Sequence, residues 1–252
     1  MADRKPLIAG NWKLFKTIPE ALTLVDGLKK NLAGVSEREI LVCPPFTALY
    51  AVAQALKSSN ISVGSQNIFW EKKGAFTGEV APDMLVDAGC KYAIVGHSER
   101  RQYFGETDET VNKRMKAAFA AGLVPIVCIG EMLAEREGGT TFKVIERQIK
   151  NGIAGLSPEQ AKTLVIAYEP VWAIGTGKTA TPQQAEEVHA YIRKLYSQMY
   201  SETAAGSIRI LYGGSVKPDN VSEIMKQPNV DGALVGGASL ETESFAKLVK
   251  YI

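Results

Sequence analysis

The sequence has few cysteines and no long apolar run. Its three cysteines, Cys43, Cys90 and Cys128, form no C-x-x-C pair and cannot all be bridged within one chain. A disulfide framework or a cysteine-based metal site is therefore not expected. The first apolar run, residues 7–9, is too short for the core of a signal peptide or for a membrane-spanning helix. This pattern predicts a cytoplasmic protein with no membrane partner.

A strong charge imbalance is also missing. The chain has 29 Lys and Arg residues against 27 Asp and Glu residues, a net charge of +2. That balance gives no field that would attract nucleic acid or a membrane, although a local cluster could still bind a small anion. The 252 residues, 46% of them hydrophobic, are enough for one domain, residues 1–252, with a large buried core.

Eight short apolar runs alternate with longer amphipathic stretches. We expect the runs to be strands, at residues 6–11, 39–43, 61–65, 92–96, 123–129, 164–168, 208–212 and 232–235. The stretches predict helices at residues 19–31, 45–57, 82–88, 108–121, 141–151, 181–200, 218–226 and 239–250. His189 lies one place beyond the apolar stripe of its helix, so we expect it near the surface. Strands with little polar alternation are typical of parallel sheets covered on both faces. The order predicts an α/β fold, a single (β/α)₈ barrel, and a large open sheet also fits.

Polar groups follow three of the predicted strands, where barrel enzymes carry their chemistry. Asn11 and Lys13 follow the first strand and share strand parity, so we expect them to project to one side. His97 ends the fourth strand, where an imidazole could polarise a substrate or move a proton. Glu169 ends the sixth strand, where partial burial would raise its pKa and favour a general base. The ordinary alternatives are a solvated lysine, a core histidine and a structural ion pair.

The loop after Glu169 carries apolar side chains and glycines. Residues 170–180 begin at a proline and include Trp172 and Ile174, which a purely solvated connection would not need. We interpret the loop as a lid that closes over a substrate and expels water. Residues 177–179 resemble the end of a nucleotide-binding P-loop, but Trp172 stands where that motif has its first glycine.

Two glycine pairs indicate an anion site. Residues 213–214 follow the seventh strand and residues 236–237 follow the eighth. Paired glycines let a phosphate approach backbone N–H groups, and these two loops form a recurrent phosphate site in barrels.

One long connection, residues 65–79, carries aromatic side chains. These side chains indicate either a protein partner or a loop folded back on its own barrel.

Five segments resemble the triosephosphate isomerase family, in the family's order and across nearly the whole chain. They are residues 10–13, 95–101, 167–178, 212–215 and 235–238. The resemblance implies an isomerase that interconverts dihydroxyacetone phosphate and D-glyceraldehyde 3-phosphate through an enediol(ate), in glycolysis and gluconeogenesis. It implies no metal and no organic cofactor.

The resemblance also implies a role for each motif residue. Glu169 is the base, and His97 is a neutral electrophile beside a helix start at residues 98–100. Lys13 supplies charge and Asn11 a hydrogen bond. The residues expected to contact the substrate are Asn11, Trp12, Lys13, Gly175, Ser215, Gly236 and Gly237. Ser98 and Glu99 are expected to support the catalytic groups.

A homodimer is a further implication of the resemblance. The loop 65–79, with Gln66 and Thr77, is expected to insert into a partner beside that partner's first-strand lysine. Leu14 and Phe15 vary from the family's common pattern, which affects details of the interface and not the chemistry.

Two other functions compete with this interpretation. A Schiff-base aldolase would need a buried lysine on a middle strand, and no middle strand predicted here carries one. A phosphate-binding scaffold built on an inactive barrel would have lost the base, the electrophile or the lysine. Glu169, His97 and Lys13 are all present.

Overall fold

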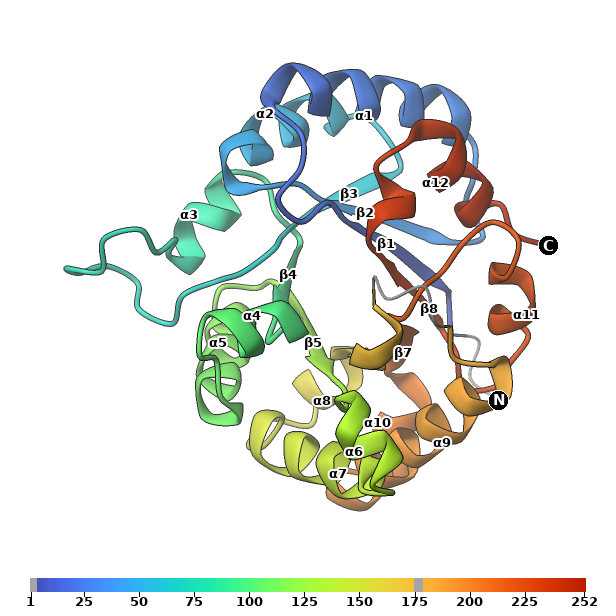
Figure 1. Ribbon diagram of the computed structural model, residues 1–252. Helices are drawn as coiled ribbons and strands as arrows, with labels where there is room; N and C mark the ends of the chain where they lie inside the picture. The colour runs from blue at the N-terminus through green and yellow to red at the C-terminus, as the bar shows by residue number, and fades with distance from the viewer. Residues whose placement is uncertain (1–3, 175–178) are drawn as a thin grey trace.

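The computed structural model describes residues 4–174 and 179–252. Eight parallel strands close into a barrel in sequence order (Figure 1). The strands are β1 (Leu7–Asn11), β2 (Glu39–Cys43), β3 (Ile61–Ser65), β4 (Tyr92–Val95), β5 (Val124–Ile129), β6 (Val165–Tyr168), β7 (Arg209–Tyr212) and β8 (Gly232–Val235). The predicted barrel is confirmed, and the open sheet is excluded because β8 pairs with β1.

Helices form a ring around the barrel (Figure 1). The longer ones are α1 (Ile18–Leu32), α2 (Phe46–Leu56), α5 (Asp108–Ala120), α7 (Thr141–Gly152), α9 (Pro182–Met199) and α12 (Thr242–Val249). The shorter ones are α3 (Pro82–Asp87), α4 (Ser98–Tyr103), α6 (Leu133–Glu137), α8 (Gln160–Thr163), α10 (Glu202–Ser207) and α11 (Val221–Met225). Two 3₁₀ turns, η1 (Val171–Ala173) and η2 (Gly237–Ser239), follow β6 and β8.

The strands bury both of their faces, as their sequences predict. Alternate residues such as Leu7, Ala9 and Leu41 pack together inside the barrel. The residues between them, such as Ile8 and Ile40, pack outward against the helices. This two-sided burial is the reason that the strands read as continuous apolar runs.

The amino-terminal end of the barrel interior carries a polar cluster. Glu39, at the start of β2, accepts a hydrogen bond from the Tyr92 hydroxyl and forms an ion pair with Arg209. Arg209 Nη2 also donates to the Tyr92 hydroxyl, at 3.3 Å. The cluster joins three strands at the end opposite to the one where the sequence predicts chemistry.

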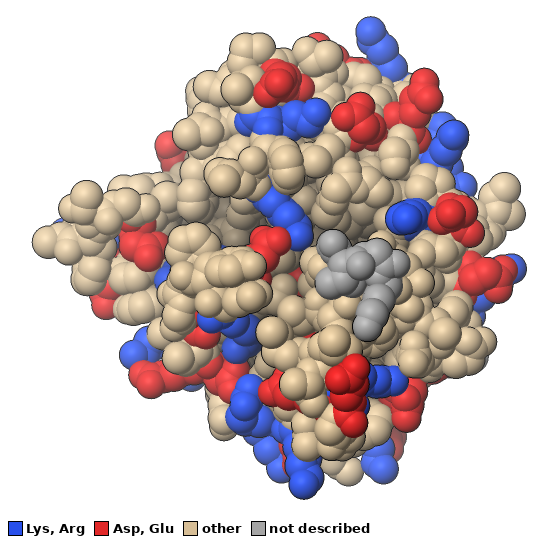
Figure 2. All heavy atoms as spheres, in the orientation of Figure 1, with Lys and Arg blue, Asp and Glu red and all other residues tan. Residues whose placement is uncertain are grey.

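Charged side chains of both signs are intermixed over the face shown in Figure 2. None of the described helices is both long enough and apolar enough to cross a membrane.

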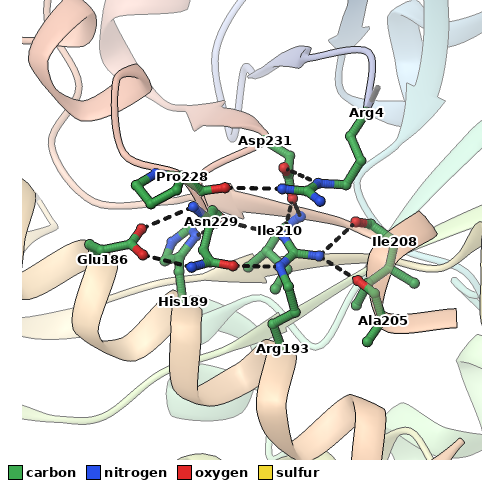
Figure 3. A network of polar contacts seen from close by, with 10 residues as sticks. All are labelled: Arg4, Glu186, His189, Arg193, Ala205, Ile208, Ile210, Pro228, Asn229 and Asp231. Atoms are coloured by element: carbon green, nitrogen blue, oxygen red, sulfur yellow. Dashed lines mark hydrogen bonds and ion pairs between the residues drawn. The ribbon is translucent and has the colours of Figure 1, made fainter. Parts of the chain in front are cut away.

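A network of buried polar groups ties α9 to the loop before β8 (Figure 3). Arg193 Nη2 lies 2.5 Å from Asp231 Oδ2, and Arg193 Nε donates to Asn229 Oδ1 at 2.7 Å. Asp231 also pairs with Arg4 at 2.5 Å. His189 belongs to this network and is fully buried, with Nδ1 3.1 Å from the Asn229 carbonyl. The expectation of a surface histidine is therefore wrong, because the loop before β8 covers that side of the helix.

Candidate active site

A cavity of about 290 Å³ lies at the carboxyl ends of the strands. Figure 2 shows a hollow on this face with a basic and an acidic side chain beside it. The predicted site residues that line the cavity are Asn11, Lys13, His97, Glu169, Ser215, Gly236 and Gly237. These residues come from five separate parts of the chain, at the ends of β1, β4, β6, β7 and β8, and the closed barrel brings them together.

The other predicted site residues lie elsewhere. Trp12 is fully buried in the layer between barrel and helices. Gln66 and Thr77 do not line the cavity, and Thr77 is exposed. Gly175 lies outside the described residues, as do residues 176–178 of the predicted lid.

Glu169 is held at the end of β6 by neighbours from other strands. Its backbone N–H donates to the Ile129 carbonyl at 2.7 Å, and the residue is only 2% exposed. Carboxylate Oε1 lies 2.9 Å from His97 Nε2, and Oε2 accepts a hydrogen bond from the Ser98 N–H at 2.9 Å. The carboxylate therefore faces two donors inside the cavity.

These donors reverse the expected direction of the pKa shift at Glu169. Burial disfavours the carboxylate and raises the pKa, as expected from the sequence. The His97 ring and the Ser98 N–H both stabilise the carboxylate, and together they hold the pKa of Glu169 below its usual 4.5. The prediction of a raised pKa is wrong, because it considered burial without the donors.

His97 is the N-cap residue of α4, and this position determines its tautomer. Its Nδ1 accepts a hydrogen bond from the Glu99 N–H at 3.2 Å, so in the neutral ring Nδ1 is unprotonated and Nε2 carries the proton. Burial lowers the pKa of His97, whereas the carboxylates of Glu169 and Glu99 raise it, and the balance lies above 6.5. A substrate placed between His97 and Glu169 would remove the largest of the raising contributions.

Lys13 lies just beyond β1 in a left-handed backbone conformation, with φ of 51°. The alternation of side chains along a strand therefore does not set the direction of the Lys13 side chain. Asn11 and Lys13 nevertheless line the same cavity, as expected from the sequence. Lys13 Nζ lies 2.7 Å from Glu99 Oε1, and the Lys13 N–H donates to Asn11 Oδ1 at 3.1 Å. Gln66 Nε2 donates to the Lys13 carbonyl at 2.9 Å, which ties the turn to β3 within the same chain.

The two glycine loops border the side of the cavity opposite His97. The Gly213 N–H donates to the Tyr168 carbonyl at 2.7 Å, and a Cβ at position 213 would lie 2.9 Å from the Cγ of Glu169. Only glycine permits this close approach of the two loops. At the other loop, a Cβ at position 236 would lie 3.3 Å from the Cε of Lys13.

The beginning of the predicted lid is held by a buried carboxylate that sequence reasoning missed. Glu131 is fully buried, and its Oε1 accepts hydrogen bonds from Trp172 Nε1 at 2.9 Å and from the Tyr168 hydroxyl at 3.1 Å. The Val171 N–H donates to the Glu131 carbonyl at 3.1 Å. The available signal was a carboxylate close after an apolar strand: Glu131 follows β5 by two residues, and Glu169 follows β6 directly.

The long loop after β3 combines both of its expected forms. Phe69 is buried, with its ring 4.1 Å from Trp70 and 4.8 Å from Phe76, so the base of the loop folds back on the barrel. The rest of the loop projects away from the ring of helices (Figure 1). Residues 71–78, which include Phe76 and Thr77, are exposed.

Acid–base groups at the carboxyl mouth of an eight-stranded parallel barrel define the class of (β/α)₈-barrel enzymes. Within that class, a profile of the triosephosphate isomerase family matches residues 6–252. The chain is 65% identical to the triosephosphate isomerase of Endomicrobium trichonymphae over 248 residues, 98% of this chain and 99% of the relative. It is 61% identical to that of Moorella thermoacetica, with the same coverage. The crystal structure of triosephosphate isomerase from Bartonella henselae is similar with a TM-score of 0.88, at 37% identity over 97% of each chain. The chain belongs to the triosephosphate isomerase family.

Proposed function

We propose that this protein interconverts dihydroxyacetone phosphate and D-glyceraldehyde 3-phosphate through an enediol(ate). The observation that carries the proposal is the contact of 2.9 Å between His97 Nε2 and Glu169 Oε1, in one cavity with Lys13 and the glycine loops. A carboxylate and an N–H donor so close together can act on the carbon and the oxygen of one carbonyl compound.

The reaction is a proton transfer at each step. Glu169, which is ionised, takes a proton from the carbon next to the carbonyl, while the Nε2–H of His97 donates a hydrogen bond to the carbonyl oxygen. The enediol(ate) forms, and the proton on the oxygen of the first carbon passes through His97 Nε2 to the former carbonyl oxygen. Glu169 then returns its proton to the neighbouring carbon, so the carbonyl group has moved by one carbon. Lys13 and Asn11 stabilise the oxygen on which negative charge develops. No electron carrier enters this balance.

The phosphate group of the substrate lies on the glycine loops. Backbone at Ser215, Gly236 and Gly237 holds it, so a group that does not react positions the carbons that do. Gly175 is proposed for the same role from the lid. Closure of residues 170–180 excludes water and keeps the intermediate from losing its phosphate.

We also propose that the protein is a homodimer in the cytoplasm. Large apolar side chains that are exposed in the single chain gather after the first four strands: Leu14, Phe15, Phe46, Tyr50, Phe76, Met84, Tyr103 and Phe104. The projecting loop with Thr77 would enter a second copy near its Lys13, and Leu14, 94% exposed, would be covered there. The three cysteines are buried and form no disulfide, as is usual in the reducing cytoplasm, where glycolysis and gluconeogenesis take place.

A coupled assay with each triose phosphate tests the activity. We expect turnover in both directions, and the variant Glu169→Gln is expected to lose about 10²–10⁴-fold in kcat, the usual contribution of a positioned base. Glu187→Gln, the same change at an exposed position of α9, serves as the control and is expected to keep full activity. Equal rates for the two variants would remove Glu169 from the mechanism.

A further inference from the structure

The cavity carries a second lysine that the resemblance does not assign. Lys217 follows β7, two residues after Ser215, and lines the same cavity as Lys13 and Gly236. It is exposed at the cavity's rim. Among the residues that the structure describes, no carboxylate lies within ion-pair distance of its ammonium, which distinguishes it from Lys13.

The charges around the cavity show what this lysine can do. Lys13 is already paired with Glu99 at 2.7 Å, so that pair contributes no net charge. Glu169 adds one negative charge, which His97, 2.9 Å away, balances only while its ring is protonated. With a neutral His97 and without Lys217, the described groups would present a net negative site to a phosphate dianion.

The loop around Lys217 is built and held on both sides. The Lys217 N–H donates to Asn220 Oδ1 at 2.8 Å, and Asn220 Nδ2 donates to the Ser215 carbonyl at 3.1 Å. Val216, between the two, is buried in the core. One asparagine therefore fixes the backbone of Ser215, expected at the phosphate, together with the backbone that carries the ammonium.

We propose that Lys217 is a binding residue for the phosphate dianion of the substrate and supplies the positive charge that Lys13 shares with Glu99. The proposal rests on the function proposed above and adds a residue to its phosphate end. The ammonium acts through the field at the rim, so its effect is expected to depend on ionic strength, unlike hydrogen bonds from the glycine loops.

Calorimetric titration with inorganic phosphate tests the proposal without turnover. At an ionic strength of about 0.02 M, we expect Lys217→Gln to bind phosphate about three- to tenfold more weakly than the unmodified protein. At about 0.3 M the difference is expected to fall below about twofold, because dissolved salt screens the attraction of an exposed ammonium. Lys217→Arg keeps the charge and is expected to restore binding.

Lys194→Gln, which removes one exposed charge from α9, is the matched control and is expected to bind like the unmodified protein. Lys217→Gln binding as tightly as the control at low ionic strength would overturn the proposal, as would a loss that is the same at both ionic strengths.

Kinetics separate this proposal from the proposed activity. For Lys217→Gln we expect the loss in kcat/KM to appear mainly in KM, because the phosphate charge does not change between ground state and transition state. An unmodified protein that binds phosphate but does not isomerise would refute the activity, while the binding constants still decide the role of Lys217. Full turnover together with an unaffected Lys217→Gln variant would refute only the role of Lys217.

Discussion

At the scale of single residues, the burial of His189 predicts how the free energy of unfolding depends on pH. The imidazole is fully buried, and its Nδ1 lies 3.1 Å from the Asn229 carbonyl, so Nδ1 carries the proton of the neutral ring. Burial is the main cause that lowers the pKa of His189 to about 3; the Asn229 carbonyl raises the pKa by a smaller amount, and the nearby Arg193 has the smallest effect and lowers it. The native state therefore holds this histidine neutral over most of the pH range.

The sign of the pH dependence follows from this shift. The pKa is about 3 in the folded protein against 6.5 in the unfolded chain, so only the unfolded chain takes up the proton between these values. The stabilisation is complete above pH 6.5 and declines as the pH falls toward 3. Between pH 7 and pH 5, His189 is expected to reduce the free energy of unfolding by about 2 kcal/mol.

His189→Gln removes the titrating group and keeps an N–H that can donate to the Asn229 carbonyl. Urea unfolding of both proteins at one protein concentration, at pH 7 and pH 5, is expected to show the unmodified protein losing about 2 kcal/mol more than the variant. Parallel losses in the two proteins would show that His189 does not carry this dependence.

His189 and Glu169 also show what residue-level prediction from sequence lacks. The sequence predicts a site at the ends of the strands, and Glu169, His97, Lys13 and Asn11 do line one cavity there. The donors that lower the pKa of Glu169 lie about 70 residues away, and the loop that buries His189 lies 40 residues away. The spacing of nearby residues does not reveal such distant contacts. The direction of the pKa shift at Glu169 and the burial of His189 could therefore not be predicted from the sequence.

At the scale of elements, α9 offers a test of how the chain resumes after the lid. Thr181 Oγ1 accepts a hydrogen bond from the Gln184 N–H at 3.1 Å, and Gln184 Oε1 accepts one from the Thr181 N–H at 2.9 Å. This capping box satisfies two N–H groups at the start of an 18-residue helix.

Thr181→Ala is therefore expected to lower the free energy of unfolding by about 1 kcal/mol, measured by urea unfolding. Thr23→Ala is the matched control, since the Thr23 hydroxyl donates only to the Pro19 carbonyl one turn earlier in α1. The control is expected to change stability by less than about 0.5 kcal/mol. A similar change in both variants would mean that the box contributes nothing.

The long elements were predictable because each carries many periodic positions and recognisable ends. The predicted 181–200 stretch becomes Pro182–Met199, and β2, β3 and β8 have the predicted bounds. The missed helices, α6, α8 and α10, have four to six residues, too few for an apolar stripe to repeat. Their positions depend on packing between the larger helices and not on local sequence.

At the scale of the whole molecule, the closure of the barrel depends on which strands pair, whereas the proposed dimer depends on which side chains are exposed. Alternation of strands and helices predicts parallel βαβ units, but it cannot distinguish an open sheet from a barrel, because both satisfy the same local pattern. The pairing of β8 with β1 settles that choice. The exposed apolar side chains after the first four strands support the homodimer proposed above, which the local sequence pattern alone does not predict.

Thr77→Arg tests the assembly. Thr77 is exposed and belongs to the loop after β3, which projects from the ring of helices (Figure 1). If this tip is buried against a second copy, a long charged side chain there has no partner and costs several kcal/mol of association free energy. Sedimentation velocity is expected to show a dimer for the unmodified protein and mainly a monomer for the variant at micromolar concentration.

Thr203→Arg, at an exposed position of α10, adds the same side chain elsewhere on the ring and is expected to leave the dimer intact. The monomer is also expected to turn over more slowly. The left-handed backbone of Lys13 is held by hydrogen bonds with Asn11 and Gln66, and its side chain by an ion pair with Glu99. A second copy packed over Lys13 would restrict this strained turn further. A Thr77→Arg protein that sediments as a dimer would exclude this loop from the interface, and an active monomer would show that the turn needs no partner.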